Sequence, residues 1–292
     1  MKNFFESCRQ FLKFGVLVQA AAFLLSASAL AEAEALSAAE HLHGTETVGM
    51  YIGDVPYTGR SVLYKDTTYV ELGELSAELR VCSRSWDSVT ETAFYAGEGI
   101  TMTITDGLPY LEANGRYLWC ENGVFADADG VYVPLRAAAK ALGAEVHWDA
   151  ESFSAHVRPG DSPILSGDRF YVPDEVHWLS RIIHAEAGVE PFLGQIAVGN
   201  VVLNRVRSET FPDTIYAVIF DRNYGVQFTP TANGTIYNTP DAEAVIAAKL
   251  CLEGYSLSHE ILYFLNAALA ENLWVPRNRP YVMTISGHDF YS

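Results

Sequence analysis

The pattern of apolar and polar residues changes along the chain. An apolar run from Val16 to Leu30 comes first. From about Val48, short runs rich in Val, Tyr and Thr alternate with Gly and Asp, which predicts strands joined by turns. From Tyr171 onward, apolar residues recur at helical spacing, which predicts amphipathic helices. We therefore expect a strand-rich region followed by a mainly helical region.

The strand-rich region contains an internal near-repeat. A Tyr-Val-Glu-Leu sequence at 69–72 precedes a short apolar helical pattern and a Trp-Asp pair at 86–87. A Tyr-Val-Pro-Leu sequence at 132–135 likewise precedes a helical pattern, the helix stop Gly143 and a Trp-Asp pair at 148–149. Two copies are too few for a solenoid. The pattern predicts two related halves of one small α+β domain, in which each half is a strand, a short helix and a returning strand.

The helical region is expected to begin with Asp174 as the N-cap of a helix that starts at Glu175 and stops at Gly188. Proline, glycine and polar residues divide the rest of this region. Further helices are expected from Pro191 past Asn204-Arg205, from Phe211-Pro212-Asp213 to Ile219, and from Asp241 to Leu252. Strands are expected at 261–265 and 281–285, with loops at 224–234 and around Trp274 and Arg277–Arg279.

Composition and charge narrow the function classes. The hydrophobic fraction of 49% supports buried cores and excludes a disordered chain. The formal net charge of −17 disfavours nucleic acid, because Lys and Arg contacts to phosphates dominate that kind of binding. It also disfavours anionic lipid and anionic wall polymers. Any contact with a glycan must therefore rest on local hydrogen bonds and aromatic faces.

The first residues have the pattern of a secretory signal. Three basic residues (Lys2, Arg9 and Lys13) precede the apolar run, and small residues follow at 27–31. We expect residues 1–31 to be a cleaved signal peptide. An uncleaved membrane anchor is the alternative, although the run is short for a bilayer span. Residues 32–47 are expected to be a linker, and the protein to be secreted.

The cysteines and histidines fit no metal motif. Cys82 and Cys120 fall in the same strand-rich region. The sequence leaves open whether they form a disulfide after export or remain two free thiols. Cys251 lies on an apolar helical pattern and is expected to be a buried thiol. Near His147 and His156, no third histidine or cysteine occurs at a spacing that would complete a metal site. We expect no metal and no cofactor.

One carboxylate occupies an unusual position. Glu186 follows Ile182 and Ile183 on the apolar stripe of the first helix, near its end. Desolvation raises the pKa of a carboxyl group, which then stays protonated near neutral pH as a general acid requires. The alternatives are a structural acid paired with Arg181 or Arg205, or an exposed residue at a frayed helix end.

Other candidate site residues lie in loops. A segment that mixes polar and aromatic side chains offers hydrogen bonds beside flat apolar faces, which suits sugar recognition. The candidates for substrate binding are Tyr224, Gln227, Phe228, Thr229, Asn266, Glu190 and His288. His288 either contacts the substrate or packs with Phe290 and Tyr291.

The order of the motifs carries a family resemblance. The sequences IHAEAGVEP at 183–191, GQIAV at 194–198, VLNRV at 202–206, FP at 211–212, QFTP at 227–230 and GHDFY at 287–291 resemble the SleB/CwlJ-type cell wall hydrolases, over about residues 174–292. This resemblance implies a lysozyme-like, mainly helical α+β domain at 173–292, with Glu186 as the catalytic acid. Residues 48–158 resemble the copper amine oxidase N-terminal-like domain, an accessory module, and residues 159–172 would be a linker.

The resemblance also suggests a mechanism. No second carboxylate is clearly placed for the usual two-carboxylate glycosidase, and lytic transglycosylation of peptidoglycan requires one Glu. A hydrolytic muramidase assisted by Glu190 or Asp221 is the alternative on the same bond. A third possibility is an inactive wall-binding or spore-coat protein, against which the intact Glu186 argues. Peptidoglycan glycan strands are the expected partner, from either vegetative wall or spore cortex. The resemblance implies a secreted protein that is associated with the cell wall, or with the spore cortex or coat as the alternative.

Overall fold

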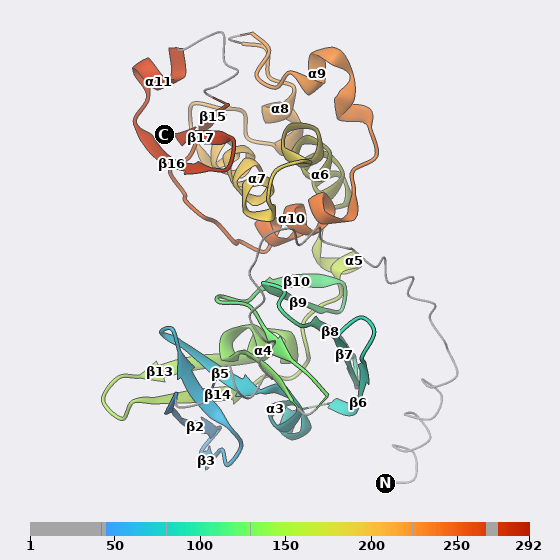
Figure 1. Cartoon of the computed structure of the whole chain (residues 1–292), viewed down its shortest axis with the longest axis vertical. Helices are drawn as coiled ribbons and strands as arrows, with labels where there is room; N and C mark the ends of the chain where they lie inside the picture. The colour runs from blue at the N-terminus through green and yellow to red at the C-terminus, as the bar shows by residue number, and fades with distance from the viewer. Residues whose placement is uncertain (1–41, 43–44, 80, 129, 224, 267–273) are drawn as a thin grey trace. The chain divides into compact units, whose positions relative to one another are not determined.

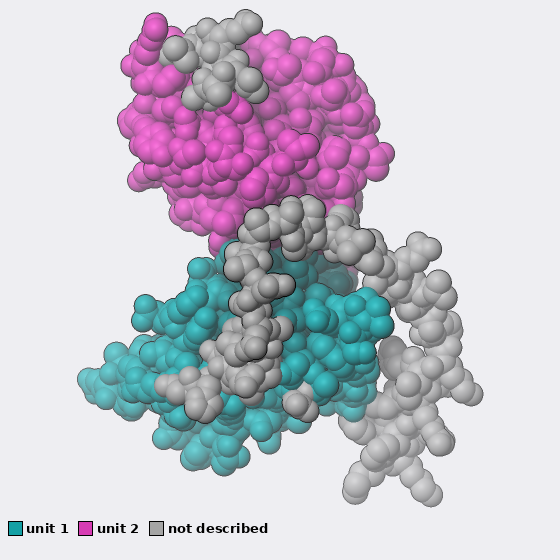
Figure 2. All heavy atoms as spheres, in the orientation of Figure 1, with its two compact units in different colours: residues 1–166 teal, residues 167–292 magenta. Residues whose placement is uncertain are grey.

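The chain folds into two compact units. The computed structural model describes residue 42 and residues 45–79, 81–128, 130–223, 225–266 and 274–292. The first unit comprises residues 1–166 and the second residues 167–292 (Figures 1 and 2). The predicted signal peptide at 1–31 lies outside the described residues. The α+β class is confirmed, because the first unit is rich in strands and the second is mainly helical with a small sheet (Figure 1).

Strands dominate the described part of the first unit. One sheet has the order β1-β4-β5-β12-β11, a second β10-β9-β8-β7-β6 and a third β13-β14-β2-β3. Their strands are β1 (Glu46–Thr47), β2 (Gly49–Ile52), β3 (Val55–Pro56), β4 (Ser61–Tyr64), β5 (Thr67–Glu71), β6 (Val81–Asp87), β7 (Thr92–Gly97), β8 (Ile100–Thr105), β9 (Tyr110–Ala113), β10 (Arg116–Trp119), β11 (Phe125–Ala126), β12 (Val131–Pro134), β13 (Ala144–Asp149) and β14 (Ser154–Pro159). Two helices, α3 (Leu72–Leu79) and α4 (Leu135–Leu142), pack among them.

The near-repeat is visible in the element order. The first copy is β5, α3 and β6, and the second is β12, α4 and β13, so each copy is a strand, a helix and a returning strand as predicted. The two copies meet at β5 and β12, which are antiparallel neighbours with Val70 opposite Val133. Gly143 ends α4 with a φ of 73°, a left-handed conformation that favours glycine. The apolar faces of both helices join one core of this unit.

Cys82 and Cys120 do not form a disulfide with each other. Cys82 lies on β6 and Cys120 directly follows β10, and these strands are the two edges of one five-stranded sheet. Neighbouring strands are about 4.8 Å apart, and a disulfide requires Cα atoms within about 7 Å of each other. The fold therefore excludes the pairing that the sequence left open.

Helices dominate the second unit. They are α5 (Gly167–Phe170), α6 (Pro173–Ala187), α7 (Phe192–Arg207), α8 (Ile215–Ile219), α9 (Pro230–Asn233), the 3-10 helix η1 (Thr235–Tyr237), α10 (Ala242–Leu252) and α11 (Trp274–Asn278). A small antiparallel sheet has the order β15-β17-β16, with β15 (Tyr263–Leu265), β16 (Tyr281–Ile285) and β17 (His288–Tyr291). Helix α7 packs against α6, α8 and α10, and it is buried along most of its length (Figure 1). None of the helices described in either unit has the length and apolarity that a bilayer span requires.

Several element boundaries differ from those predicted. Helix α6 begins at Pro173 with Val172 as its N-cap, so Asp174 lies in the first turn and is not the cap. Proline suits the first helical position because its φ is already helical and it has no N–H to satisfy there. The segment from Trp274 forms the short helix α11 where a loop was expected. The final residues add β17, which pairs with both β15 and β16.

Gly199 allows α7 to approach its neighbours closely. A Cβ atom at this position would lie 2.8 Å from Cys251 Sγ and 2.9 Å from Ile183 Cδ1. Both distances are too short for real contacts, so Gly199→Ala must shift these two side chains or the helices α6 and α10 that carry them. Because two contacts are too short, the overpacking cost should lie in the upper half of its usual range, at about 2–3 kcal/mol. The gain of about 1 kcal/mol in helix propensity offsets only part of this cost. We therefore expect Gly199→Ala to lower the free energy of unfolding by about 1–2 kcal/mol in chemical denaturation.

A second variant separates the clash from other effects of the change. Cys251→Ala removes the sulfur atom, so the double variant should regain part of the stability that Gly199→Ala loses. A Gly199→Ala protein as stable as the unchanged chain would show that this helix contact is looser than described.

Candidate active site

Helix α6 carries Glu186 in its last turn. Leu179, Ile182 and Ile183 are fully buried on the inner stripe of this helix, and Glu186 extends that stripe. The helix ends directly afterwards, where the Gly188 N–H donates to the His184 carbonyl. Glu186 is therefore held by a buried helix and is only partly accessible to water.

Burial sets the protonation of this carboxyl group. Desolvation raises the pKa of Glu186 from 4.5 to about 7, and the positive charge of Arg205 opposes part of that rise. The carboxylate makes no hydrogen bond or ion pair with another described residue. A carboxyl group with a pKa near 7 exchanges a proton readily at neutral pH, which is the property of a general acid and base.

Arg205 projects from α7 into a cage of aromatic rings. Its guanidinium carbon lies 4.9 Å from the ring centre of Phe211, 5.1 Å from that of Phe228 and 5.4 Å from that of Tyr263. Its Nε donates to the Leu262 carbonyl over 2.7 Å. Rings on several sides and a backbone acceptor leave this cation with one orientation.

The positive charge of Arg205 interacts electrostatically with two carboxylates. The side chain is 5% exposed, and burial lowers its pKa to about 10, so it stays protonated at neutral pH. Asp221 and Glu186 both stabilise the positive charge electrostatically. Arg205 Nη1 is buried and has no hydrogen-bond partner among the described residues. Arg181, the other cation considered as a partner of Glu186, instead donates to the carbonyls of Ile236 and Asn238.

Three predicted site residues meet at a second place in this unit. Glu190 follows α6, Asn266 follows β15, and His288 begins β17. The Gly287 N–H donates to Glu190 Oε2 over 3.3 Å, and His288 Nδ1 lies 3.8 Å from Glu190 Oε1. A Cβ atom on Gly287 would lie 3.2 Å from Asn266 Nδ2, so the Asn266 amide reaches the same turn. The β16–β17 turn is thus tied to the loop between α6 and α7.

His288 packs against aromatic rings as well as facing Glu190. Its ring centre lies 5.3 Å from that of Phe264 and 6.3 Å from that of Phe290. The side chain is buried, and its Nδ1 has no hydrogen-bond partner among the described residues. Of the two alternatives for His288, the structure thus contains the packing of its ring against Phe290.

The polar segment after α8 has mixed exposure. Phe228 is 1% exposed and packs under Arg205 and near Phe264, so its ring supports the cation from inside the fold. Gln227 is partly exposed, and its Nε2 lies 3.5 Å from the Gly225 carbonyl as a donor. Thr229 is exposed beside α9. Tyr224 lies outside the described residues.

The sequence did not single out the aromatic cage. The sequence indicates Arg205 only as a possible ion-pair partner of Glu186, and no periodic pattern marks Phe211 or Tyr263 as site residues. A usable signal was present, because Asn204 and Arg205 are polar residues on an otherwise apolar, buried helix. Buried polar groups require partners, and here those partners come from distant segments.

The histidines considered above as metal ligands have other neighbours within the described residues. The described part of the chain contains no group of three or more His, Cys, Asp or Glu side chains that would hold an ion. His147 and His156 are opposite each other on β13 and β14, and His156 stacks on Tyr51. His184 Nδ1 lies 3.2 Å from Asp241 Oδ2.

Comparison with known families matches both units. The Cell Wall Hydrolase family model matches residues 189–291, and the Copper amine oxidase N-terminal domain model matches residues 53–157. Both resemblances expected from the sequence are confirmed. The first match begins beyond Glu186, so it does not test the role of that residue.

Relatives of known type share the second unit. A spore cortex-lytic enzyme of Halalkalibacterium halodurans is 37% identical over 120 residues, which are 41% of this chain and 35% of that protein. A spore cortex-lytic enzyme of Bacillus subtilis is 34% identical over 117 residues, which are 40% of this chain and 37% of that protein. The chain thus spans less than half the length of these relatives.

A solved structure is similar to the same region. The catalytic domain of the germination-specific lytic transglycosylase SleB from Bacillus anthracis is 34% identical, and the match covers 42% of this chain and 97% of that domain, with a TM-score of 0.39. Residues 189–291 therefore form a cell wall hydrolase domain similar to that of the spore cortex-lytic enzymes, and residues 53–157 form a copper amine oxidase N-terminal domain.

Proposed function

We propose that residues 173–292 form a lytic transglycosylase domain that cuts the linkage between N-acetylmuramic acid and N-acetylglucosamine in peptidoglycan. The observation that carries this proposal is the state of Glu186: one carboxyl group with a pKa of about 7, beside a caged cation. The relatives indicate the substrate class, because they are spore cortex-lytic enzymes and the catalytic domain of a lytic transglycosylase. The protein would act outside the cytoplasm, at the wall or spore cortex.

Glu186 would act twice in this reaction. As an acid it protonates the glycosidic oxygen, and the bond from that oxygen to C1 of the muramoyl residue breaks. As a carboxylate it then removes the proton from the C6 hydroxyl of the same residue, whose oxygen attacks C1 and closes a 1,6-anhydro ring. The substrate supplies its own nucleophile, so the reaction consumes no water. Arg205 would stabilise the carboxylate that exists between the two steps.

Sugar contacts would come from the residues around this helix end. Asn266 and Glu190 offer an amide and a carboxylate near the β16–β17 turn, and Gln227 and Thr229 offer polar groups at the surface. Each of these side chains can donate to or accept from sugar hydroxyl or acetamido groups. His288 would position Glu190 and not bind the sugar directly, because its ring is buried.

Hydrolysis of the same bond is the second candidate. Hydrolytic glycosidases use a second carboxylate to activate water or to form the covalent intermediate. Asp221 is the stronger candidate for that role, because it shares the electrostatic environment of Arg205 with Glu186. The Glu190 carboxylate is instead engaged by the Gly287 N–H.

Mass spectrometry of the products tests the proposal. We expect the purified full chain to release fragments that end in 1,6-anhydro-N-acetylmuramic acid, each one water lighter than the hydrolytic product. Vegetative wall and spore cortex would be digested in parallel, and a heat-inactivated sample serves as the control. Fragments with reducing ends would overturn transglycosylation and support hydrolysis with Asp221. An absence of fragments from both materials would instead favour a wall-binding or spore-coat protein.

A further inference from the structure

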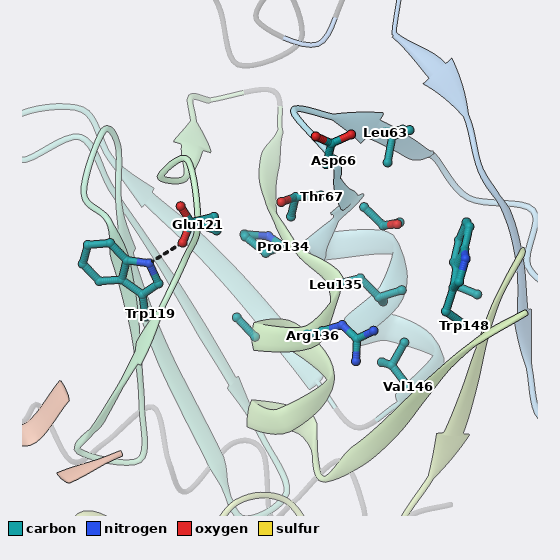
Figure 3. Close-up of a pocket in the computed structure, with 13 residues that line it drawn as sticks. Leu63, Asp66, Thr67, Trp119, Glu121, Pro134, Leu135, Arg136, Val146 and Trp148 are labelled. Atoms are coloured by element: carbon teal, nitrogen blue, oxygen red, sulfur yellow. Dashed lines mark hydrogen bonds between the residues drawn. The ribbon is translucent and has the colours of Figure 1, made fainter. Parts of the chain in front are cut away.

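The first unit contains a hollow of about 470 Å³. Its walls come from the β4–β5 hairpin, the end of β10 with the residues just after it, the end of β12, the start of α4, and the strands β13 and β14. Figure 3 shows Asp66 and Leu63 on one side, Trp148 and Val146 on a second, and Trp119 with Glu121 on a third, while Arg136 lies on α4 beside Val146. The volume is in the range of pockets that bind small ligands, roughly 300–1,000 Å³. All residues that line this hollow belong to the first unit, and none of them is a candidate residue of the site around Glu186.

One side of the hollow is an aromatic and aliphatic surface. Trp148 and Val146 are two residues apart on β13, so their side chains lie on the same face of the sheet. The ring of Phe153 contacts Trp148 edge to face at 5.1 Å and holds the indole in place. Trp148 is only partly buried, and its indole nitrogen makes no hydrogen bond with another described residue. A flat indole therefore remains accessible on this side.

The opposite sides carry polar groups that are not engaged. Arg136 is exposed in the first turn of α4, and its guanidinium makes no hydrogen bond or ion pair with another described residue. Asp66 is exposed at the tip of the β4–β5 hairpin, where its φ is 61°. The Thr68 hydroxyl also lines the hollow. The hollow thus combines hydrogen-bond donors and acceptors with the aromatic ring of Trp148.

This combination matches a saccharide. A pyranose ring has an apolar C–H face that packs on an indole, and hydroxyl groups at its edge that both donate and accept hydrogen bonds. An anionic polymer does not fit, because Asp66 and Glu121 line the hollow with only one cation, and the chain carries a net charge of −17. We propose that this hollow binds a short, uncharged stretch of N-acetylated amino sugars in wall glycan.

The consequence for the chain is retention on its substrate. Two sites on one chain raise the effective concentration of the second site once the first is bound. The first unit would hold the glycan through Trp148, Arg136 and Asp66 while the second unit cleaves it. This inference rests on the proposed function, because it takes its ligand class from the wall substrate.

NMR with a defined probe tests the inference on the full chain. Chitotetraose, a neutral oligosaccharide of N-acetylglucosamine, is added to protein in which the indole N–H groups are observed. The chain has five Trp residues, and the signal missing from Trp148→Phe identifies Trp148. We expect the Trp148 signal to shift on titration, and Trp148→Ala and Arg136→Gln to weaken the affinity for the probe by roughly tenfold and threefold, respectively.

A matched control lies on the neighbouring strand. Arg158 is an exposed arginine of β14 that pairs with Glu145 and does not line the hollow, so Arg158→Gln should leave the affinity unchanged. A Trp148 signal that does not move would overturn the inference. It would also be overturned if Arg136→Gln and Trp148→Ala both bound chitotetraose as tightly as the unchanged chain does. Shifts caused by the free stem peptide of peptidoglycan, but not by chitotetraose, would also overturn it.

Failure of this inference and failure of the proposed function are distinguishable. Trp148→Ala should still cleave short soluble glycan fragments but should pull down with insoluble wall less completely than the unchanged chain. Glu186→Gln should lose cleavage and keep the Trp148 shift. A chain that cleaves glycan but shows no Trp148 shift would retain the proposed function and reject the hollow as a sugar site.

Discussion

Glu186→Gln is expected to abolish cleavage of peptidoglycan, with a loss of roughly 10³-fold or more in rate. Glutamine has nearly the same shape, but it neither donates a proton to the glycosidic oxygen nor removes one from the C6 hydroxyl. General acid–base catalysis contributes about 10²–10⁴-fold in a single step, and Glu186 would serve in two. The loss of turbidity of a wall suspension measures the rate. Glu175→Gln, an exposed change in the first turn of the same helix, should leave the rate unchanged.

The stability of the Glu186→Gln protein checks that the loss is chemical. The folded pKa of Glu186 is raised to about 7 from 4.5, so the folded state binds the proton more tightly than the unfolded state. Unfolding free energy should therefore fall as the pH rises from 4.5 through 7, by at most about 3 kcal/mol from this residue. The Gln variant lacks that dependence and should be at least as stable as the unchanged chain at pH 8. Full activity in a folded Glu186→Gln protein would refute the assignment.

Arg205→Met is expected to move the alkaline limb of the pH–rate profile to higher pH. The unchanged chain should lose kcat/KM above about pH 7, as the acid form of Glu186 disappears. Arg205 lowers the pKa of Glu186, so removing its charge raises that pKa further. The variant should also lose about 2–4 kcal/mol of stability, because the cation packs against three rings and a backbone carbonyl.

Arg205→Lys separates the two roles of this residue. Lysine keeps the positive charge, so the position of the alkaline limb should stay near that of the unchanged chain. It loses the planar stacking on Phe211, Phe228 and Tyr263, so stability should still fall. If the alkaline limb of the pH–rate profile also stays in place in Arg205→Met, the charge of Arg205 does not influence the pKa of Glu186.

The periodic features were predictable from the sequence, and the contacts between distant segments were not. Helix α6 and the position of Glu186 on its inner stripe follow from apolar spacing within one segment. The copies of the near-repeat were also visible, because each is a local strand–helix–strand pattern. The aromatic cage was not, because Phe211, Phe228 and Tyr263 come from separate segments with no common period. Whether Cys82 reaches Cys120 likewise depends on strand order in the sheet, which spacing along the chain does not determine.

The covered position of Arg205 has a consequence for the response to ionic strength. Mobile ions screen exposed charges, with a Debye length of about 8 Å at physiological salt, but they screen buried charges much less. The three rings around the guanidinium keep salt away from it. Encounter of this acidic chain with charged wall polymers will therefore vary strongly with salt, whereas the proton affinity of Glu186 will not. Changes in salt concentration around the wall would alter how often this chain meets charged polymers and would leave the proton affinity of Glu186 the same.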